Sequence, residues 1–427
     1  MRFIHTADWH LGNQMHDIDR RKESAAFLKW LKKQIVEKQA ETLIVSGDIF
    51  DTVNPSVEAR RLYYTFLASL VDSCCKNVII IGGNHDSAVM LDSAKELLDV
   101  LNIHVVGSIN NLSPGDMCFE LRDRNENVNG ICMALPFVRE VELRNLLSDS
   151  RVEDGDLYSL AYKKLYSTVF DEAEKLRACR DIPVIATGHL YANNIDGRSS
   201  QGGNQSGRGM RRDDGTKVLD VLGTLGFVPP AVFPPADYVA LGHIHYATMV
   251  EKNPAIRYSG SPFVMGFDEA DTSHYVLCVD LSVSGGKSGL KVEPIKTESF
   301  FDYRRLSGTL AEIKEMLENF PASNENGTFL ELCYKRELGI NARDYLEEAI
   351  NALSQNVSVV SWKLSEPDRI FSAENRKQLD AVEIKNLDDR EIFTQLILSK
   401  SALEKDSKEA KESIEKFLPL FLKIAAE

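Results

Sequence analysis

Five short polar motifs along the chain carry residue types that bind metal ions in enzymes. They read HTADWHLG, SGDIFD, GGNHDS, TGHLY and LGHIHY, and each follows an apolar run of strand length. Carboxylate, imidazole and amide ligands without a thiolate suit Mn, Fe, Zn or Mg better than a structural zinc site. The candidate metal ligands are Asp8, His10, Asp48, Asn84, His189, His243 and His245.

This ligand set predicts two ions, because seven ligands are too many for one ion and suit two that share a carboxylate. Two ions about 3.5–4 Å apart can clamp the attacking and leaving oxygens of a phosphoryl displacement. Each motif taken alone could be an ordinary strand-end turn. Five of the nine histidines, however, follow expected strands close to a glycine, so the joint pattern favours a phosphoesterase site.

The elements that must position these motifs are strands and helices in alternation. Stripes of apolar residues predict helices over 22–38 and 56–73. This order predicts an α/β layered fold, in which ligand sites lie beyond the carboxyl ends of the strands. The predicted strands cover residues 2–6, 42–46, 77–81, 182–187, 237–241 and 256–260.

After about residue 275 the sequence pattern changes. Residues 275–295 alternate like a hairpin, and a small α+β module should follow, with helices over 309–319 and 341–354. Strand-like runs lie at 329–335 and 357–364, and the tail after about 372 is charged and helical.

Composition gives an ordinary globular chain with an acidic balance. The 427 residues carry a net charge of −14, which argues mildly against non-specific DNA binding but does not exclude a local basic groove. Apolar runs stay well short of a membrane span, and the N-terminus does not read as a secretory signal. Seven cysteines without a CxxC pair indicate a reduced, cytoplasmic protein.

The five motifs, in this order, resemble those of the calcineurin-like metallophosphoesterases: DxH, GDxxD, GNH[DE], GH and GHxH. The blocks HTADWHLG and FPPADYVALGHIH are more specifically similar to the break-repair nuclease family, whose members work with an SbcC-type coiled-coil ATPase. The resemblance implies a metallophosphoesterase β-sandwich flanked by helices, a small α+β capping domain and C-terminal helices. It places the nuclease domain at 1–281, the capping domain at 282–370 and a helical segment that docks the ATPase at 371–427.

The resemblance also implies a role for each ligand. Asp8, His10 and His245 hold one metal, whereas Asn84, His189 and His243 hold the other, and Asp48 bridges the two. His85 lies beside the metals without binding them, and would stabilise the transition state or protonate the leaving 3′ oxygen. Asp51 would orient His85 through its carboxylate, although some relatives have histidine there. Asp86 is expected to support the turn.

The function implied by the resemblance is a Mn-dependent DNA nuclease in DNA repair, replication and recombination. It would be a 3′–5′ exonuclease on double-stranded ends and an endonuclease on single strands and hairpins. The resemblance also implies manganese as the metal and a homodimer within a heterotetramer with the ATPase. It further implies a nucleoid-associated cytoplasmic location. The alternatives are a phosphoesterase acting on small nucleotides or phosphomonoesters, and an inert scaffold, against which the complete ligand set argues.

Six basic residues are candidates for DNA contact. Two follow the first ligand loop and could equally be plain surface residues, and four lie in the Gly-rich stretch 190–216. That stretch could track a DNA backbone or be a disordered insert. An apolar face near residue 417 could dock the ATPase or pack on its own chain. The candidates are His16, Arg20, Arg198, Arg208, Arg211 and Arg212.

Overall fold

The structure, a computed structural model, describes residues 1–16, 18–147, 157–192, 227–321, 324–335, 337 and 340–364. All of these belong to one compact unit, Met1–Ser365. The predicted helical segment 371–427 and the four arginines of the Gly-rich stretch lie outside the described residues.

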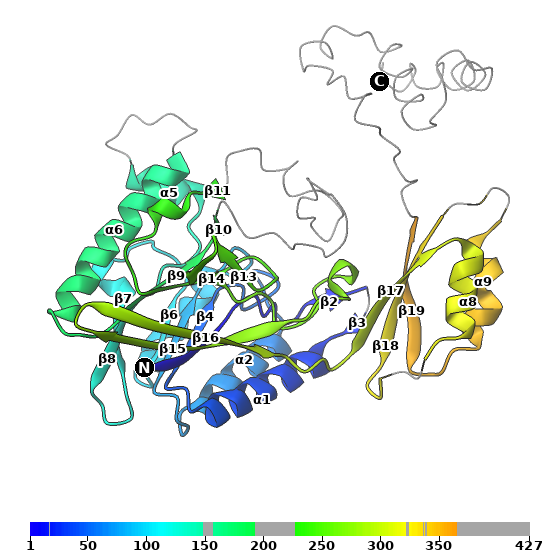
Figure 1. Cartoon of the computed structure of the whole chain (residues 1–427), viewed down its shortest axis with the longest axis horizontal. Coiled ribbons are helices and arrows are strands. Elements are labelled where there is room, and N and C mark those ends of the chain that lie inside the picture. The colour runs from blue at the N-terminus through cyan, green and yellow to red at the C-terminus, as the bar shows by residue number, and fades with distance from the viewer. Residues whose placement is uncertain are drawn as a thin grey trace, which may run out of the picture. The chain divides into compact units, whose positions relative to one another are not determined.

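Two six-stranded sheets form the body of the first unit (Figure 1). The first has the order β16-β15-β1-β4-β5-β6, with β1, β4, β5 and β6 parallel. Its strands are β1 Arg2–Thr6, β4 Thr42–Ser46, β5 Asn77–Ile81, β6 Ile103–Val106, β15 Tyr275–Ser284 and β16 Lys287–Lys296. Because its parallel strands end at one edge, their following loops meet there.

The second sheet has the order β13-β14-β12-β9-β8-β7, and β8, β9, β12 and β14 are parallel. Its strands are β7 Cys118–Arg122, β8 Val128–Met133, β9 Val184–His189, β12 Tyr238–Gly242, β13 Thr248–Val250 and β14 Asn253–Tyr258. In β9 and β12, His189 pairs with Gly242, so the motifs GHLY and GHIH leave the sheet side by side.

Alternating side chains explain the layers. In β4, Leu43 and Val45 pack in one core with α1 and α2, whereas Ile44 packs in another core with the second sheet. Figure 1 shows α1 and α2 on one side of the sheets and α5 and α6 on the other. The helices of this body are α1 Arg21–Lys38, α2 Val57–Leu70, α3 Ala88–Asp92, α4 Lys95–Asp99, α5 Glu140–Leu146 and α6 Leu157–Arg177. The predicted β-sandwich flanked by helices is therefore confirmed.

A small α+β module follows. Its three parallel strands are ordered β17-β18-β19 and share a core with α8 and α9. The elements are β17 Asp302–Gly308, α8 Leu310–Glu318, β18 Thr328–Tyr334, α9 Ala342–Asn351 and β19 Val357–Leu364. Every element predicted between residues 309 and 364 is present.

The boundary predicted at residue 282 comes too early. Residue 282 lies inside β15, and β16 pairs with β15 at ten successive positions, so the first sheet continues to Lys296. Gly285 and Gly286, with φ of 56° and 70°, form the tight turn of this long hairpin. The module begins only near β17.

Short elements complete the body. They are β2 Gln14–Met15, β3 Ile18–Asp19, η1 Pro114–Met117, β10 Tyr191–Ala192, β11 Phe227–Val228, η3 Pro230–Val232 and η4 Phe267–Glu269. Within the described ranges, every helix is too short or too polar to span a bilayer.

Candidate metal centre

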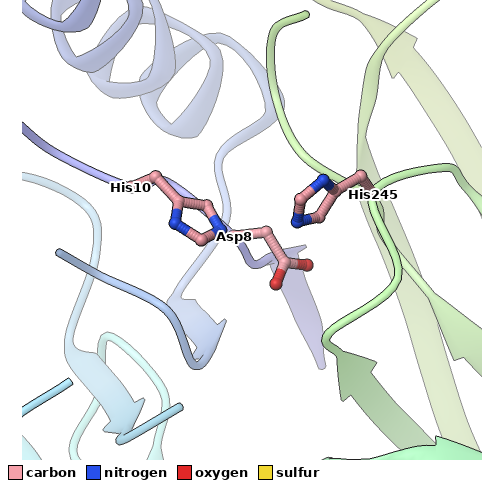
Figure 2. A group of neighbouring side chains, drawn as sticks. All are labelled: Asp8, His10 and His245. Carbon is pink, nitrogen blue, oxygen red and sulfur yellow. The ribbon is translucent and has the colours of Figure 1, made fainter. Parts of the chain in front are cut away.

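The loops at the carboxyl ends of the strands bring the seven predicted ligands together. The ligand atoms of Asp8, His10 and His245 lie within 4.8 Å of one another, and so do those of Asp48, His189 and His243. Figure 2 shows His10 and His245 on either side of Asp8, with His245 arriving from a loop of the second sheet. The first group is the set predicted for one ion, and the second joins His189 and His243 of the other predicted set with Asp48, the predicted bridge.

Asp48 lies between the two groups. Its Oδ2 atom is 3.6 Å from Nε2 of His10 and 3.2 Å from Nε2 of His189. Ligands that surround one ion tetrahedrally at about 2.1 Å lie about 3.4 Å from each other. Asn84 joins the second group, because its Oδ1 is 3.0 Å from Nε2 of His189. The geometry suits a carboxylate shared by two ions.

Four of the candidate ligands have a left-handed backbone. The φ angles of Asp8, His10, Asp48 and His243 are 55°, 43°, 50° and 98°. Such conformations cost about 1–3 kcal/mol each and persist only where the surroundings hold them. Here the amide of His10 donates to the carbonyl of Asp48 at 3.0 Å, and the amide of His243 donates to Oδ1 of Asp8 at 2.9 Å. The fold therefore holds strained ligands in one arrangement.

Gly83 makes room for the shared carboxylate. A Cβ at this position would lie 2.1 Å from Oδ1 of Asp48 and 2.3 Å from its backbone nitrogen. The same Oδ1 accepts the backbone N–H of His85 at 2.9 Å. The glycine before the NHD motif is thus required by close approach of Asp48.

Neighbouring charges in the cluster lower the pKa of Asp48 and raise the pKa values of His189 and His245. Burial opposes ionisation of Asp48, but the imidazoles of His189 and His10 hold the pKa of Asp48 well below its ordinary value. Against the lowering effect of burial, Asp48 and Asp8 raise the pKa of His189 to about 9. In the same way, Glu269 and Asp8 raise the pKa of His245 to about 9. The nearby carboxylates thus favour the protonated forms of His189 and His245 when no metal is bound.

The residues fit a divalent cation. Both ring nitrogens of His10 are buried, and neither has a hydrogen-bond partner within the described residues. A buried polar atom without a partner is costly, and coordination to an ion would satisfy one of them. The donors are carboxylate, imidazole and amide groups, which suit hard or borderline divalent ions.

Binding of Mn²⁺ to the metal-free protein should release protons at about pH 7.5. His189 and His245, with pKa values of about 9, are protonated there and must lose their protons to become ligands. The apparent affinity should therefore rise as the pH rises towards 9, by up to about tenfold per pH unit for each released proton. Titration calorimetry in two buffers of different ionisation enthalpy counts the protons, and equal heats in both buffers would contradict this expectation.

Two groups that sequence reasoning missed orient the imidazoles. Oε1 of Glu269 lies 3.6 Å from Nδ1 of His245, and the carbonyl of Ser46 lies 2.9 Å from Nδ1 of His189. Such partners direct the other ring nitrogen towards a metal. The sequence around Glu269 does not indicate this role, because Glu269 lies outside the five motifs and reaches His245 only in the folded chain.

The turn at GGNHDS separates its three polar residues. The carboxylate of Asp86 is buried and accepts the backbone N–H groups of Gly83, Ile49 and Phe50 at 2.8, 3.1 and 2.9 Å. Asp86 therefore supports the turn, as expected. Asn84 faces His189, whereas the side chain of His85 is exposed.

Asp51 orients His85, but not as predicted. Nδ1 of His85 lies 2.8 Å from the backbone carbonyl of Asp51. The carboxylate of Asp51 instead accepts Nδ2 of Asn13 at 2.9 Å and lies 3.4 Å from Nδ1 of His10. The prediction that the carboxylate holds His85 is thus corrected, because that side chain is engaged by the loop after β1. His10, Asp51 and His85 form a third group with ligand atoms within 4.8 Å.

A family profile described as calcineurin-like phosphoesterase matches residues 1–247. The chain belongs to the calcineurin-like phosphoesterase family. The match covers all five ligand motifs.

Curated relatives narrow the family membership of this phosphoesterase. The SbcD subunit of the nuclease SbcCD from Escherichia coli K12 is 30% identical over 404 residues, which cover 92% of each chain. The SbcD subunit of Rhodobacter capsulatus is 34% identical over 66% of this chain and 67% of its own, and that of Bacillus subtilis is 31% identical over 66% of each. The phosphoesterase is thus also a member of the SbcD family, as the motifs predicted.

The DNA contact predicted for Arg20 is not supported. This side chain is 2% exposed, and its guanidinium donates to Glu23, Asn13 and the carbonyl of Val264. A buried guanidinium whose donors are already used cannot reach a DNA phosphate, so we assign Arg20 a structural role inside the phosphoesterase. His16 is exposed at the turn between β2 and β3 and stays a prediction.

Replacing Arg20 with methionine should destabilise the fold by about 3–5 kcal/mol, the usual cost of removing one partner from a buried ion pair. Nε of Arg20 donates to Oε2 of Glu23 at 2.6 Å, and both side chains are buried. Urea unfolding measures the change. Arg21→Met is the matched control, because Arg21 makes an exposed pair with Asp19 and should change stability little. Equal effects of the two substitutions would contradict the burial argument.

Proposed function

We propose that the protein is a Mn-dependent DNA nuclease that acts with an SbcC-type ATPase in DNA repair, recombination and replication. The observation that carries the proposal is the cluster of seven ligands around Asp48, with His85 exposed at its rim. The three similar proteins are each named as the SbcD subunit of a nuclease SbcCD, which supports a nuclease reaction and an association with an SbcC-type partner. We propose a nucleoid-associated cytoplasmic location.

In the proposed site Asp8, His10 and His245 hold one ion, whereas Asn84, His189 and His243 hold the other. Asp48 is shared by both. When bound, the two cations would lower the pKa of a water molecule and offset charge on the phosphate. Glu269 and the carbonyl of Ser46 keep the imidazoles of His245 and His189 turned towards their ions.

His85 supplies the proton chemistry. With a proton on Nδ1 donated to the carbonyl of Asp51, Nε2 is the ring nitrogen left for the substrate. A protonated Nε2 can donate to the leaving 3′ oxygen or to a phosphate oxygen whose charge increases in the transition state. The hydrogen bond from the His85 amide to Asp48 ties this group to the metal cluster.

We propose a homodimer, and exposed apolar side chains near α3 and α4 support it. Val89, Leu97 and Val100 are 83%, 70% and 81% exposed. An interface that removed these apolar side chains from water would be stabilised by their burial. Residues 371–427, outside the described part of the chain, are proposed to dock the ATPase.

The test is a cleavage assay with the full chain, Mn²⁺ and end-labelled DNA, with and without the SbcC-type ATPase and ATP. We expect 3′–5′ degradation of linear duplex, cleavage of single strands, and opening of hairpin ends when ATPase and ATP are present. Cleavage of bis(4-nitrophenyl) phosphate and small nucleotides, with no DNA cleaved under any condition, would instead establish the small-molecule phosphoesterase.

A further inference from the structure

A buried network centred on Arg20 connects the β17–β19 module to the candidate metal centre. We call Asn13, Arg20, Glu23, Val264 and Tyr303 the Arg20 network. The guanidinium donates from Nε to Glu23 at 2.6 Å, from one terminal nitrogen to Oδ1 of Asn13 at 2.9 Å and from the other to the carbonyl of Val264 at 2.6 Å. One side chain thus joins three separate segments.

Tyr303 brings the module into the network. It lies on β17, is 3% exposed, and donates its hydroxyl to Oε2 of Glu23 at 3.1 Å. Its ring centroid lies 5.5 Å from the guanidinium carbon of Arg20 and 6.0 Å from the ring of Phe267. The module therefore reaches the buried charges through the hydroxyl and ring of this tyrosine.

The other end of the network reaches His85. Nδ2 of Asn13 donates to Oδ1 of Asp51 at 2.9 Å, and the carbonyl of Asp51 accepts Nδ1 of His85 at 2.8 Å. Four successive hydrogen bonds thus lead from Tyr303 through Glu23, Arg20 and Asn13 to Asp51. The residue that holds His85 is the end of this path.

A second branch reaches His245. The carbonyl of Val264 accepts from Arg20, and the next residue, Met265, donates its N–H to Oε2 of Glu269 at 2.9 Å. Oε1 of Glu269 lies 3.6 Å from Nδ1 of His245. Arg20 also lies over the ring of Phe263 at 4.8 Å. The same guanidinium therefore fixes the segment whose carboxylate orients the ligand His245.

We propose that the Arg20 network couples the β17–β19 module to the catalytic groups, so that Tyr303 helps to set the positions of Asp51 and Glu269. The proposal rests on the proposed nuclease function. At Arg20, Glu23 and Tyr303, which are all buried, no water replaces a lost partner, so one missing hydroxyl shifts the groups bonded to it. A displacement of about 1 Å at reacting groups can cost about 10²-fold in rate. Tyr303, Arg20 and Asn13 are positioning residues in this view.

Tyr303→Phe tests the coupling, because it removes only the hydroxyl group. Hydrogen–deuterium exchange of the full chain reports it without any activity. We expect about fivefold faster exchange in peptides that cover residues 10–16, 48–55 and 261–269. Tyr334→Phe is the matched control, because Tyr334 lies on β18 of the same sheet and is not a member of the network. Unchanged exchange in Tyr303→Phe would overturn the proposal.

Turnover of bis(4-nitrophenyl) phosphate by the Mn²⁺-loaded enzyme gives the second readout. We expect kcat of Tyr303→Phe to fall about tenfold at unchanged KM and metal content, and Tyr334→Phe to match the wild type. The double variant with Asn13→Ala should lose less than the product of the two single losses, because Asn13 lies on one of the two branches through which Tyr303 acts. Multiplied effects would refute the path. If the wild type cleaved no DNA, the proposed function would fail, whereas the exchange experiment would still decide the coupling.

Discussion

His85→Gln is expected to reduce the turnover of duplex DNA cleavage by about 10²–10⁴-fold while both metals stay bound. The exposed ring is held by the carbonyl of Asp51, which leaves Nε2 for the proton transfer proposed above. Glutamine keeps the polarity and much of the size of the side chain but cannot exchange a proton at neutral pH. The amide of residue 85 still donates to Asp48, so the metal cluster should keep its shape.

Metal counting by mass spectrometry and single-turnover kinetics separate the two effects in this variant. His104→Gln is the matched control, because His104 pairs with Asp99 on the surface and stacks on Phe119. Its turnover should equal that of the wild type. His85 also lies close to His10 and Asp51, with which it could bind a metal. Loss of one metal in His85→Gln would therefore show that His85 is a ligand and would refute its role as proton donor.

Asp48→Asn is expected to remove both metals and to abolish cleavage. One oxygen of Asp48 lies between His10 and His189, and the other accepts the amide of His85. Asparagine keeps the shape but removes the negative charge that holds His189 protonated in the metal-free state. Loss of an outer partner typically weakens metal binding about 10–100-fold, and loss of the shared ligand should cost more, at both sites.

Calorimetric titration with Mn²⁺ measures the loss of metal binding in Asp48→Asn. Asp280→Asn is the control, because Asp280 lies on β15 and makes a half-exposed ion pair with Arg2. This control variant should bind two ions as the wild type does. Asn84→Ala should weaken only the ion beside His189. One ion bound at full strength in Asp48→Asn would refute the bridging role.

Much of the fold could be predicted because the signals are local. The strands β1, β4 and β5 lie at the predicted positions and have apolar, β-branched centres, and α1 and α2 carry clear apolar stripes. β7, β8 and α6 were missed, since their patterns are weaker and their faces are covered by other segments.

The sequence by itself predicted which side chains gather at the candidate metal centre, because loops after parallel strands meet at one edge of a sheet. The different roles of His85 and Asn84 were predicted only from the resemblance to the family and stay predictions. The gathering of the ligands at one edge needs only the chemistry of each side chain and its place in an element.

Only the tertiary structure decided which atoms face each other. In the structure the carbonyl of Asp51, and not its carboxylate, contacts His85. Arg20 is buried, and Glu269 lies beside His245. Tyr303 and Glu23 are 280 residues apart and meet through one hydroxyl. Such contacts depend on packing between distant segments, and packing is a property of the whole fold that no local pattern records.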